Sequence, residues 1–256
     1  MTEQLVRTSS ADGIYTIMLA RPAKRNAISD RLLAALEKAW EAAPEDTRAV
    51  ILAGEGGHFC AGLDLSEHQH REPFAVMKHS QGWQRVFNKI QMSGTPVIAV
   101  MQGAVIGGGL ELATSTHVRV AEANTMYQLP EGRHGIYVGG GASVRVARII
   151  GPGRMAEMML TGRIYSAEEG QQLGLSHYLV GKGEGLAKAQ ELAKRIAENA
   201  PLANYAMVTT IQRISNMSSD DGLYVESLMA AVAQTSPEVV ARIGSFLNRK
   251  GQGPQT

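Results

Sequence analysis

Short apolar runs alternate with amphipathic segments over the first two thirds of the chain. Each run is rich in apolar residues and bounded by turn-forming ones, which predicts strands at residues 13–20, 48–53, 96–101 and 117–122. Apolar residues at helical spacing predict helices that follow Ser29 and span about residues 73–92. Strands that alternate with helices indicate an α/β fold with mainly parallel strand pairing.

The last third of the chain has a different, almost entirely helical periodicity. Ser166 and Glu169 form a capping-box pattern, and Pro201 stands where a helix could begin. We therefore divide the chain into a core, residues 1–198, and a C-terminal helical region, residues 199–256. The apolar stripes of that region need a partner surface, which is either the core or another subunit.

Composition excludes several classes of protein. The 256 residues carry a formal net charge of +1, so no strong nucleic-acid footprint is expected. The single cysteine, Cys60, excludes an intrachain disulfide framework. No apolar run approaches the ~20 residues of a membrane span, and the first residues do not resemble a secretory signal. We expect a cytoplasmic protein without membrane or nucleic-acid partners.

Three glycine-containing segments could carry chemistry. The first, residues 58–65, follows a buried strand, and Gly62 would let the backbone approach a ligand closely. An ordinary loop in which Asp64 caps a short helix is the alternative interpretation.

The second segment, residues 103–113, places a triple glycine before a short apolar helix. Backbone N–H groups at the start of that helix could hold an anion or a developing oxyanion. Glu111 is unusual here because it stands among apolar residues. It could be catalytic, or it could be a structural carboxylate with its hydrogen bonds satisfied.

The third segment, residues 128–141, contains Glu131, which in isolation could be a surface carboxylate. Its triple glycine lacks the GxGxxG spacing of a dinucleotide site. His68 and His70 form an H-x-H pair without a recognisable third metal ligand, so we expect no metal site. We interpret Cys60 as a packed side chain.

Taken in order, these segments resemble the crotonase superfamily, the enoyl-CoA hydratase/isomerase family. The likeness covers residues 5–249 and any single piece of it is weak. The matching pieces are the segments 21–27, 59–65, 107–112, 130–131, 148–153, 160–162 and 166–167, together with Gly103.

The resemblance implies a spiral of ββα units followed by a helical trimerisation region, and thus a homo-oligomer, either a trimer or a dimer of trimers. It implies an acyl-CoA substrate and no separate cofactor. Hydration of a 2-enoyl-CoA would use Glu111 and Glu131 as catalytic groups, and the N–H groups of Leu63 and Gly108 as the oxyanion hole. The residues implied in coenzyme A binding are Lys24, Arg25, Ala27, Ala61, Gly62, Asp64 and Leu65.

The sequence departs from the hydratase pattern after Glu131, at Gly132, Arg133, His134, Tyr137 and Val138. This difference points to a polar acyl group, or to thioester hydrolysis in which a glutamate activates water. A double-bond isomerase is a further alternative of the same fold. A catalytically silent or RNA-binding relative fits less well, because both glutamates are present and the net charge is close to neutral.

Overall fold

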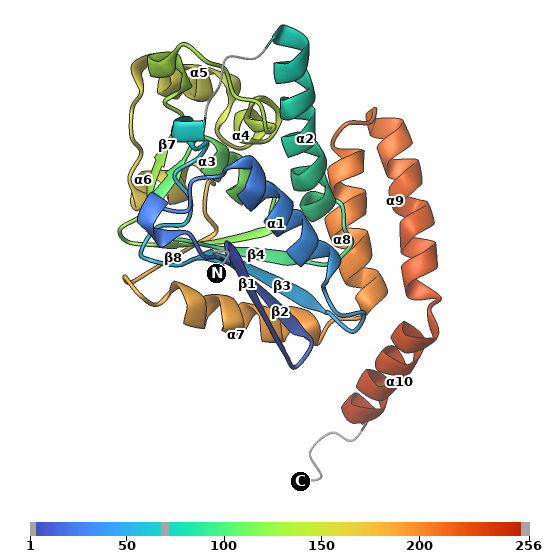
Figure 1. Cartoon of the computed structure of the whole chain (residues 1–256). Coiled ribbons are helices and arrows are strands. Elements are labelled where there is room, and N and C mark those ends of the chain that lie inside the picture. Colours follow the sequence, from blue (N-terminus) through green and yellow to red (C-terminus); the bar gives the residue numbers. More distant parts are fainter. Residues whose placement is uncertain (1–3, 68–71, 252–256) are drawn as a thin grey trace.

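The computed structural model describes residues 4–67 and 72–251, which form a six-stranded sheet covered by helices on both faces (Figure 1). The strand order is β1–β2–β3–β4–β6–β8, and only β1 runs antiparallel to its neighbour. These strands are β1 Val6–Ala11, β2 Ile14–Leu19, β3 Ala49–Gly54, β4 Val97–Met101, β6 Val118–Glu122 and β8 Tyr178–Val180.

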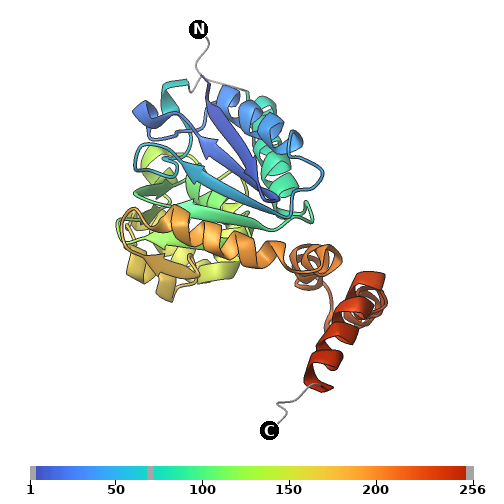
Figure 2. The ribbon, with the colours of Figure 1, turned by 90° about the horizontal axis from the view of Figure 1, so that it is seen from below.

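Both faces of the central strands are buried, as expected for a parallel sheet between helices. Successive residues of β3 and β4 point alternately into two separate apolar clusters. One cluster packs against α7 (Gly185–Ala197), and the other against α1 (Asp30–Glu41) and α2 (Pro73–Gln91). Figure 2 shows the sheet with α7 alone on one side.

A second, two-stranded parallel sheet consists of β5 (Ala104–Ile106) and β7 (Met126–Gln128). Cys60 extends it through an isolated parallel bridge to Val105. Each unit consists of a strand of the large sheet, then a short strand of the small sheet, then a helix. Two such units are β4–β5–α3 (Gly108–Ala113) and β6–β7–α4 (Ala142–Ile150). The segment β3–Cys60–α2 follows the same order. This repetition forms the expected spiral of ββα units.

The remaining elements complete the core and the C-terminal region. They are the 3₁₀ turns η1 Pro22–Lys24, η2 Leu65–Glu67 and η3 Glu131–His134, and the helices α5 Pro152–Thr161, α6 Ala167–Gln172, α8 Pro201–Ile214, α9 Ser219–Gln234 and α10 Pro237–Gly251. Helix α8 packs beside the end of α2, and α9 and α10 extend away from the sheet (Figures 1 and 2). No described helix combines the length and the apolar character needed to cross a bilayer.

The C-terminal helices carry many exposed apolar side chains, among them Leu223, Tyr224, Leu228, Val240 and Ile243. The sequence predicted such unpartnered stripes. The division at residue 198 and the role of these helices in oligomerisation remain predictions.

The long elements match the sequence predictions closely, whereas the short strands do not. Ser29 caps α1 by accepting the Leu32 N–H, and Ser166 forms the predicted capping box. Strands β5 and β7 contain three residues each and escaped prediction. The apolar spacing that predicts this helix includes Phe74 and Met77, but both side chains are exposed on the first turns of α2.

The Arg21–Ala27 motif owes its form to Asn26, which is fully buried. Its backbone is left-handed, with φ +55°. The side-chain amide donates to the carbonyl oxygens of Glu55 and His58, and its oxygen accepts the Arg21 N–H. This one side chain therefore fixes the loop after β2 against the loop after β3.

We predict that Asn26→Ala lowers the free energy of unfolding by ~2–4 kcal/mol, because three partly buried backbone groups lose their hydrogen-bond partner. Urea unfolding measures the effect. Arg25→Ala is the matched control, since Arg25 has a similar φ of +50° but an exposed side chain. Equal unfolding midpoints for the two variants would contradict the structural role of Asn26.

Candidate active site

The site forms at the carboxyl end of the small sheet, where the Cys60 bridge, β5 and β7 lie side by side. The bridge at Cys60, β5 and β7 run parallel, so their carboxyl ends lie at the same edge. The Ile106 N–H donates to the Cys60 carbonyl, and the Gly107 N–H donates to the Gln128 carbonyl. The three segments singled out in the sequence follow these strand ends and are thereby brought together.

Leu63 and Gly108 line the resulting cavity, and their backbone N–H groups are the two donors that the family resemblance implies. Neither donates a hydrogen bond to an acceptor in the described part of the chain. The two segments approach closely, because a Cβ atom at Gly62 would lie 2.6 Å from the Ile106 carbonyl oxygen and 3.2 Å from the Gly108 nitrogen. Gly62 also has φ +89°, so a glycine is needed there.

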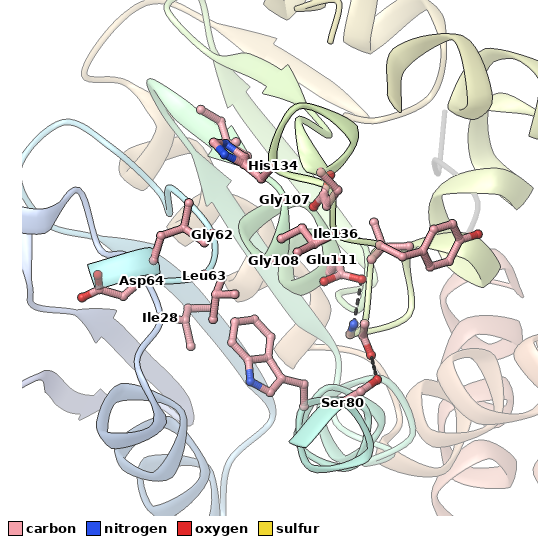
Figure 3. A pocket seen from close by; sticks show the side chains of 18 of the residues that line it. Ile28, Gly62, Leu63, Asp64, Ser80, Gly107, Gly108, Glu111, His134 and Ile136 are labelled. Carbon is pink, nitrogen blue, oxygen red and sulfur yellow. Dashed lines mark hydrogen bonds between the residues drawn. The ribbon is translucent and has the colours of Figure 1, made fainter. Parts of the chain in front are cut away.

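Glu111 lies on the first turn of α3, almost completely buried, and is held by backbone donors. Its Oε1 accepts hydrogen bonds from the N–H groups of Gly140, at 2.8 Å, and Ala142, at 2.9 Å. Burial raises the pKa of this carboxyl, whereas the two N–H groups and the charge of Arg145 act in the opposite direction. The carboxylate therefore has a fixed orientation toward the cavity (Figure 3).

Glu131 begins η3, and its carboxyl group has a different environment from that of Glu111. It is 6% exposed, and its Oε2 has no hydrogen-bond partner among the described residues. Burial raises its pKa to about 7, and the nearby Glu111 adds to the shift. A neutral carboxylic acid that faces the cavity can donate its proton there.

The cavity has a volume of about 310 Å³, and its lining includes Leu63, Gly108, Glu111 and Glu131. Helix α2 forms another wall, through His79, Ser80 and Trp83. The Trp83 ring lies directly against Gly108, where a Cβ atom would be 2.5 Å from the ring. Trp83 belongs to the apolar spacing that predicts this helix, whereas His79 and Ser80 were not predicted. Polar residues one turn before Trp83 on the same face were the available signal.

The residues implied in coenzyme A binding divide into two groups. Those that line the cavity are Ala61, Gly62, Asp64 and Leu65. Lys24 and Arg25 are exposed on the adjacent η1 turn, where Lys24 Nζ lies 3.3 Å from Ser66 Oγ, and Ala27 is buried just before the cavity-lining Ile28.

Asp64 has structural contacts as well as its place at the cavity. It pairs with Arg21 at 2.6 Å and caps η2 by accepting the Ser66 N–H. The Ser66 hydroxyl and Arg21 hold the pKa of this carboxyl at about 2, although burial acts in the opposite direction. Asp64 thus accepts the hydrogen bond expected of a cap and also lines the cavity.

The residues that depart from the hydratase pattern have different locations. His134, Tyr137 and Val138 line the cavity, and Figure 3 places His134 near Gly62 and Gly107. Arg133 instead donates to the Thr161 carbonyl at the end of α5. Gly132 packs tightly against α5, since a Cβ atom there would lie 2.7 Å from the Met159 carbonyl oxygen.

The sequence also raised Cys60 and the pair His68 and His70. Cys60 is fully buried, and burial raises its thiol pKa to about 12, which confirms a packed side chain. His68 and His70 lie outside the described residues.

Comparison with known proteins agrees with this geometry. The family model for enoyl-CoA hydratase/isomerase matches residues 9–251. The enoyl-CoA hydratase EchA19 of Mycobacterium tuberculosis is 33% identical over 91% of this chain and 92% of its own length. A crystal structure of a candidate enoyl-CoA hydratase from Rhodopseudomonas palustris has 50% identity and a TM-score of 0.95, covering 98% of this chain and 97% of its own.

A crystal structure of the enoyl-CoA hydratase from Bacillus anthracis is similar too. It has 28% identity and a TM-score of 0.90, and the match covers 96% of each chain. The ordered motifs, the ββα spiral and these matches lead to one conclusion: the chain belongs to the enoyl-CoA hydratase/isomerase family.

Proposed function

We propose that the protein hydrates a 2-enoyl-CoA thioester to the 3-hydroxyacyl-CoA, reversibly. The observation that carries this proposal is the pair of buried carboxyls in one cavity, one held by two N–H groups and the other with an oxygen that has no partner among the described residues. Addition of water to a polarised double bond needs one group to activate water and another to supply a proton. The names of the relatives support the same reaction.

In the proposed mechanism, the thioester oxygen accepts hydrogen bonds from the Leu63 and Gly108 N–H groups. These donors stabilise the enolate charge that develops as the water oxygen bonds to the β-carbon. Glu111 orients that water and takes one of its protons, while Glu131 gives its proton to the α-carbon. The two carboxyls hold one proton between them before and after the reaction.

Coenzyme A enters this proposal as part of the substrate, and no separate cofactor is needed. Lys24 and Arg25 are basic side chains on the exposed turn beside the cavity-lining segment 61–65, so we assign the phosphates of the nucleotide to them. Leu63 narrows the space for the acyl group, and His134 and Tyr137 add polar groups to it.

We also propose a homo-oligomer built on trimers. The exposed apolar residues of α9 and α10 supply the contact surface, and such a row of large apolar side chains is unusual on a monomer. The cytoplasmic location expected from the sequence stays a prediction.

The function is tested by mixing the protein with crotonyl-CoA and following ultraviolet absorbance and free thiol together. We expect the absorbance of the conjugated thioester to fall to an equilibrium value without release of thiol. Thiol release would mean hydrolysis. With a 3-enoyl-CoA as substrate instead, a gain of conjugated absorbance would mean isomerisation. Either result without hydration would contradict the proposal.

The pH dependence follows from the single proton that the two glutamates share. We expect a bell-shaped profile of kcat/KM: activity falls as pH rises through about 7, where Glu131 loses its proton. It also falls at low pH, as Glu111 is protonated above the usual carboxyl range.

Glu131→Gln should lower kcat by at least ~10². A variant that keeps most of its activity would exclude Glu131 as the proton donor.

The close approach of the two N–H segments gives a further prediction. Gly62→Ala should lower kcat by on the order of 10², because the new methyl group forces Leu63 away from Gly108. Gly57→Ala is the control, since Gly57 also has a left-handed φ, of +80°, but its Cβ would have no neighbour within 4 Å. It should cost ~1 kcal/mol of stability and leave kcat unchanged. Similar activity of both variants would refute the role of this contact.

A further inference from the structure

Arg145 on α4 is a charged side chain that is only 8% exposed and lies outside the cavity lining. Its guanidinium donates to the Gly140 carbonyl at 2.9 Å, to Gln91 Oε1 at 2.7 Å and to Asn88 Oδ1. All three acceptors are neutral. A buried cation with neutral contacts needs a balancing charge nearby, because its removal from water is costly.

The carboxylate that contacts the same Gly140–Ala142 segment is Glu111. Its charge acts to raise the pKa of the Arg145 guanidinium, and the guanidinium acts to lower the pKa of the Glu111 carboxyl. The two side chains are separated by the Gly140–Ala142 segment, which contacts both of them. Arg145 therefore acts on Glu111 from outside the cavity lining.

The backbone between them connects the two charges. The carbonyl of the Gly140–Gly141 peptide accepts from Arg145, and the N–H of the same peptide acts on Glu111 together with the Gly140 and Ala142 N–H groups. Space beside the segment is filled by the guanidinium, because a Cβ atom at Gly141 would lie 2.1 Å from Arg145 Nη1. Arg145 thus contacts the same glycine segment whose N–H groups bind Glu111, and limits its movement.

We propose that Arg145 is a positioning residue for the hydration reaction, which holds the Gly140–Ala142 donors in place and keeps the Glu111 carboxylate ionised and oriented toward water. This inference rests on the proposed function. The other titratable groups that line the cavity with Glu111 are Asp30, Asp64, His79, Glu131, His134 and Tyr137. Arg145 differs from them because it acts from the opposite side of the glycine segment.

The test is the pH profile of kcat for Arg145→Gln with crotonyl-CoA. We expect kcat to fall by about 10- to 100-fold at pH 7 with KM within twofold, because the donors are displaced while the binding surface is intact. The acidic limb should move up by on the order of one pH unit, because Glu111 loses its stabilising charge. Arg145→Lys keeps the positive charge but not the hydrogen-bond geometry. Its acidic limb should therefore lie closer to that of the unmodified protein than its kcat does.

Arg148→Gln is the matched control, since Arg148 lies one turn later on α4 and bonds only to Asn216 in the described structure. This variant should change neither kcat nor the position of the acidic limb of the pH profile. Asn88→Asp is a second variant that leaves Arg145 in place. The new carboxylate would pair with the guanidinium and should move the acidic limb upward as well.

Circular dichroism and thermal unfolding check that each variant folds. A folded Arg145→Gln enzyme with an unchanged acidic limb would overturn the proposal, as would Asn88→Asp with an unchanged limb if Arg145→Gln does not fold. These failures differ from failure of the proposed function, in which the unmodified protein would not hydrate crotonyl-CoA at any pH.

Discussion

The parallel register of the small sheet determines the site. Cys60 pairs with Val105, and β5 pairs with β7, so the chain leaves all three strands at one edge and in one direction. Leu63, Gly108 and Glu131 follow those strand ends within a few residues. A shift of one residue in this register would turn each segment to the opposite face and separate the donors from the carboxyls.

This arrangement also explains why the two glutamates can differ in protonation although they share a cavity. Both are buried, and burial favours the neutral form of each. Glu111 faces the N–H groups of a glycine-rich segment, and these donors favour its charge. Glu131 has no such donors on its Oε2 among the described residues, and the charge of Glu111 disfavours a second ionised carboxyl nearby.

Much of this could be predicted from the sequence, for identifiable reasons. The long strands and helices have clear apolar periods and caps, and Gly62, Gly107 and Gly108 stand out because they break those periods. Glu111 was conspicuous as a charge among apolar residues. Glu131 was not, because a carboxylate after a proline in a loop has no distinctive local pattern, and only the family resemblance selected it.

Other features depend on tertiary contacts and could not be predicted. β5 and β7 contain three residues each, too few for a periodic signal, and they are defined by their pairing. Arg145 looks like a surface residue of an amphipathic helix until Asn88 and Gln91 of α2 are placed against it. Asn26 likewise gains its role only when the loop after β3 supplies two carbonyl groups.

The central claim is that the Leu63 and Gly108 N–H groups polarise the thioester carbonyl of a bound acyl-CoA. Isotope-edited infrared spectroscopy tests it directly, with crotonyl-CoA labelled with ¹³C at the carbonyl and bound to the slow Glu131→Gln variant. We expect the carbonyl stretch of the bound ligand to move to lower wavenumber than in water, because two hydrogen bonds weaken the C=O bond. A bound ligand whose carbonyl stretch equals the value in water would contradict it.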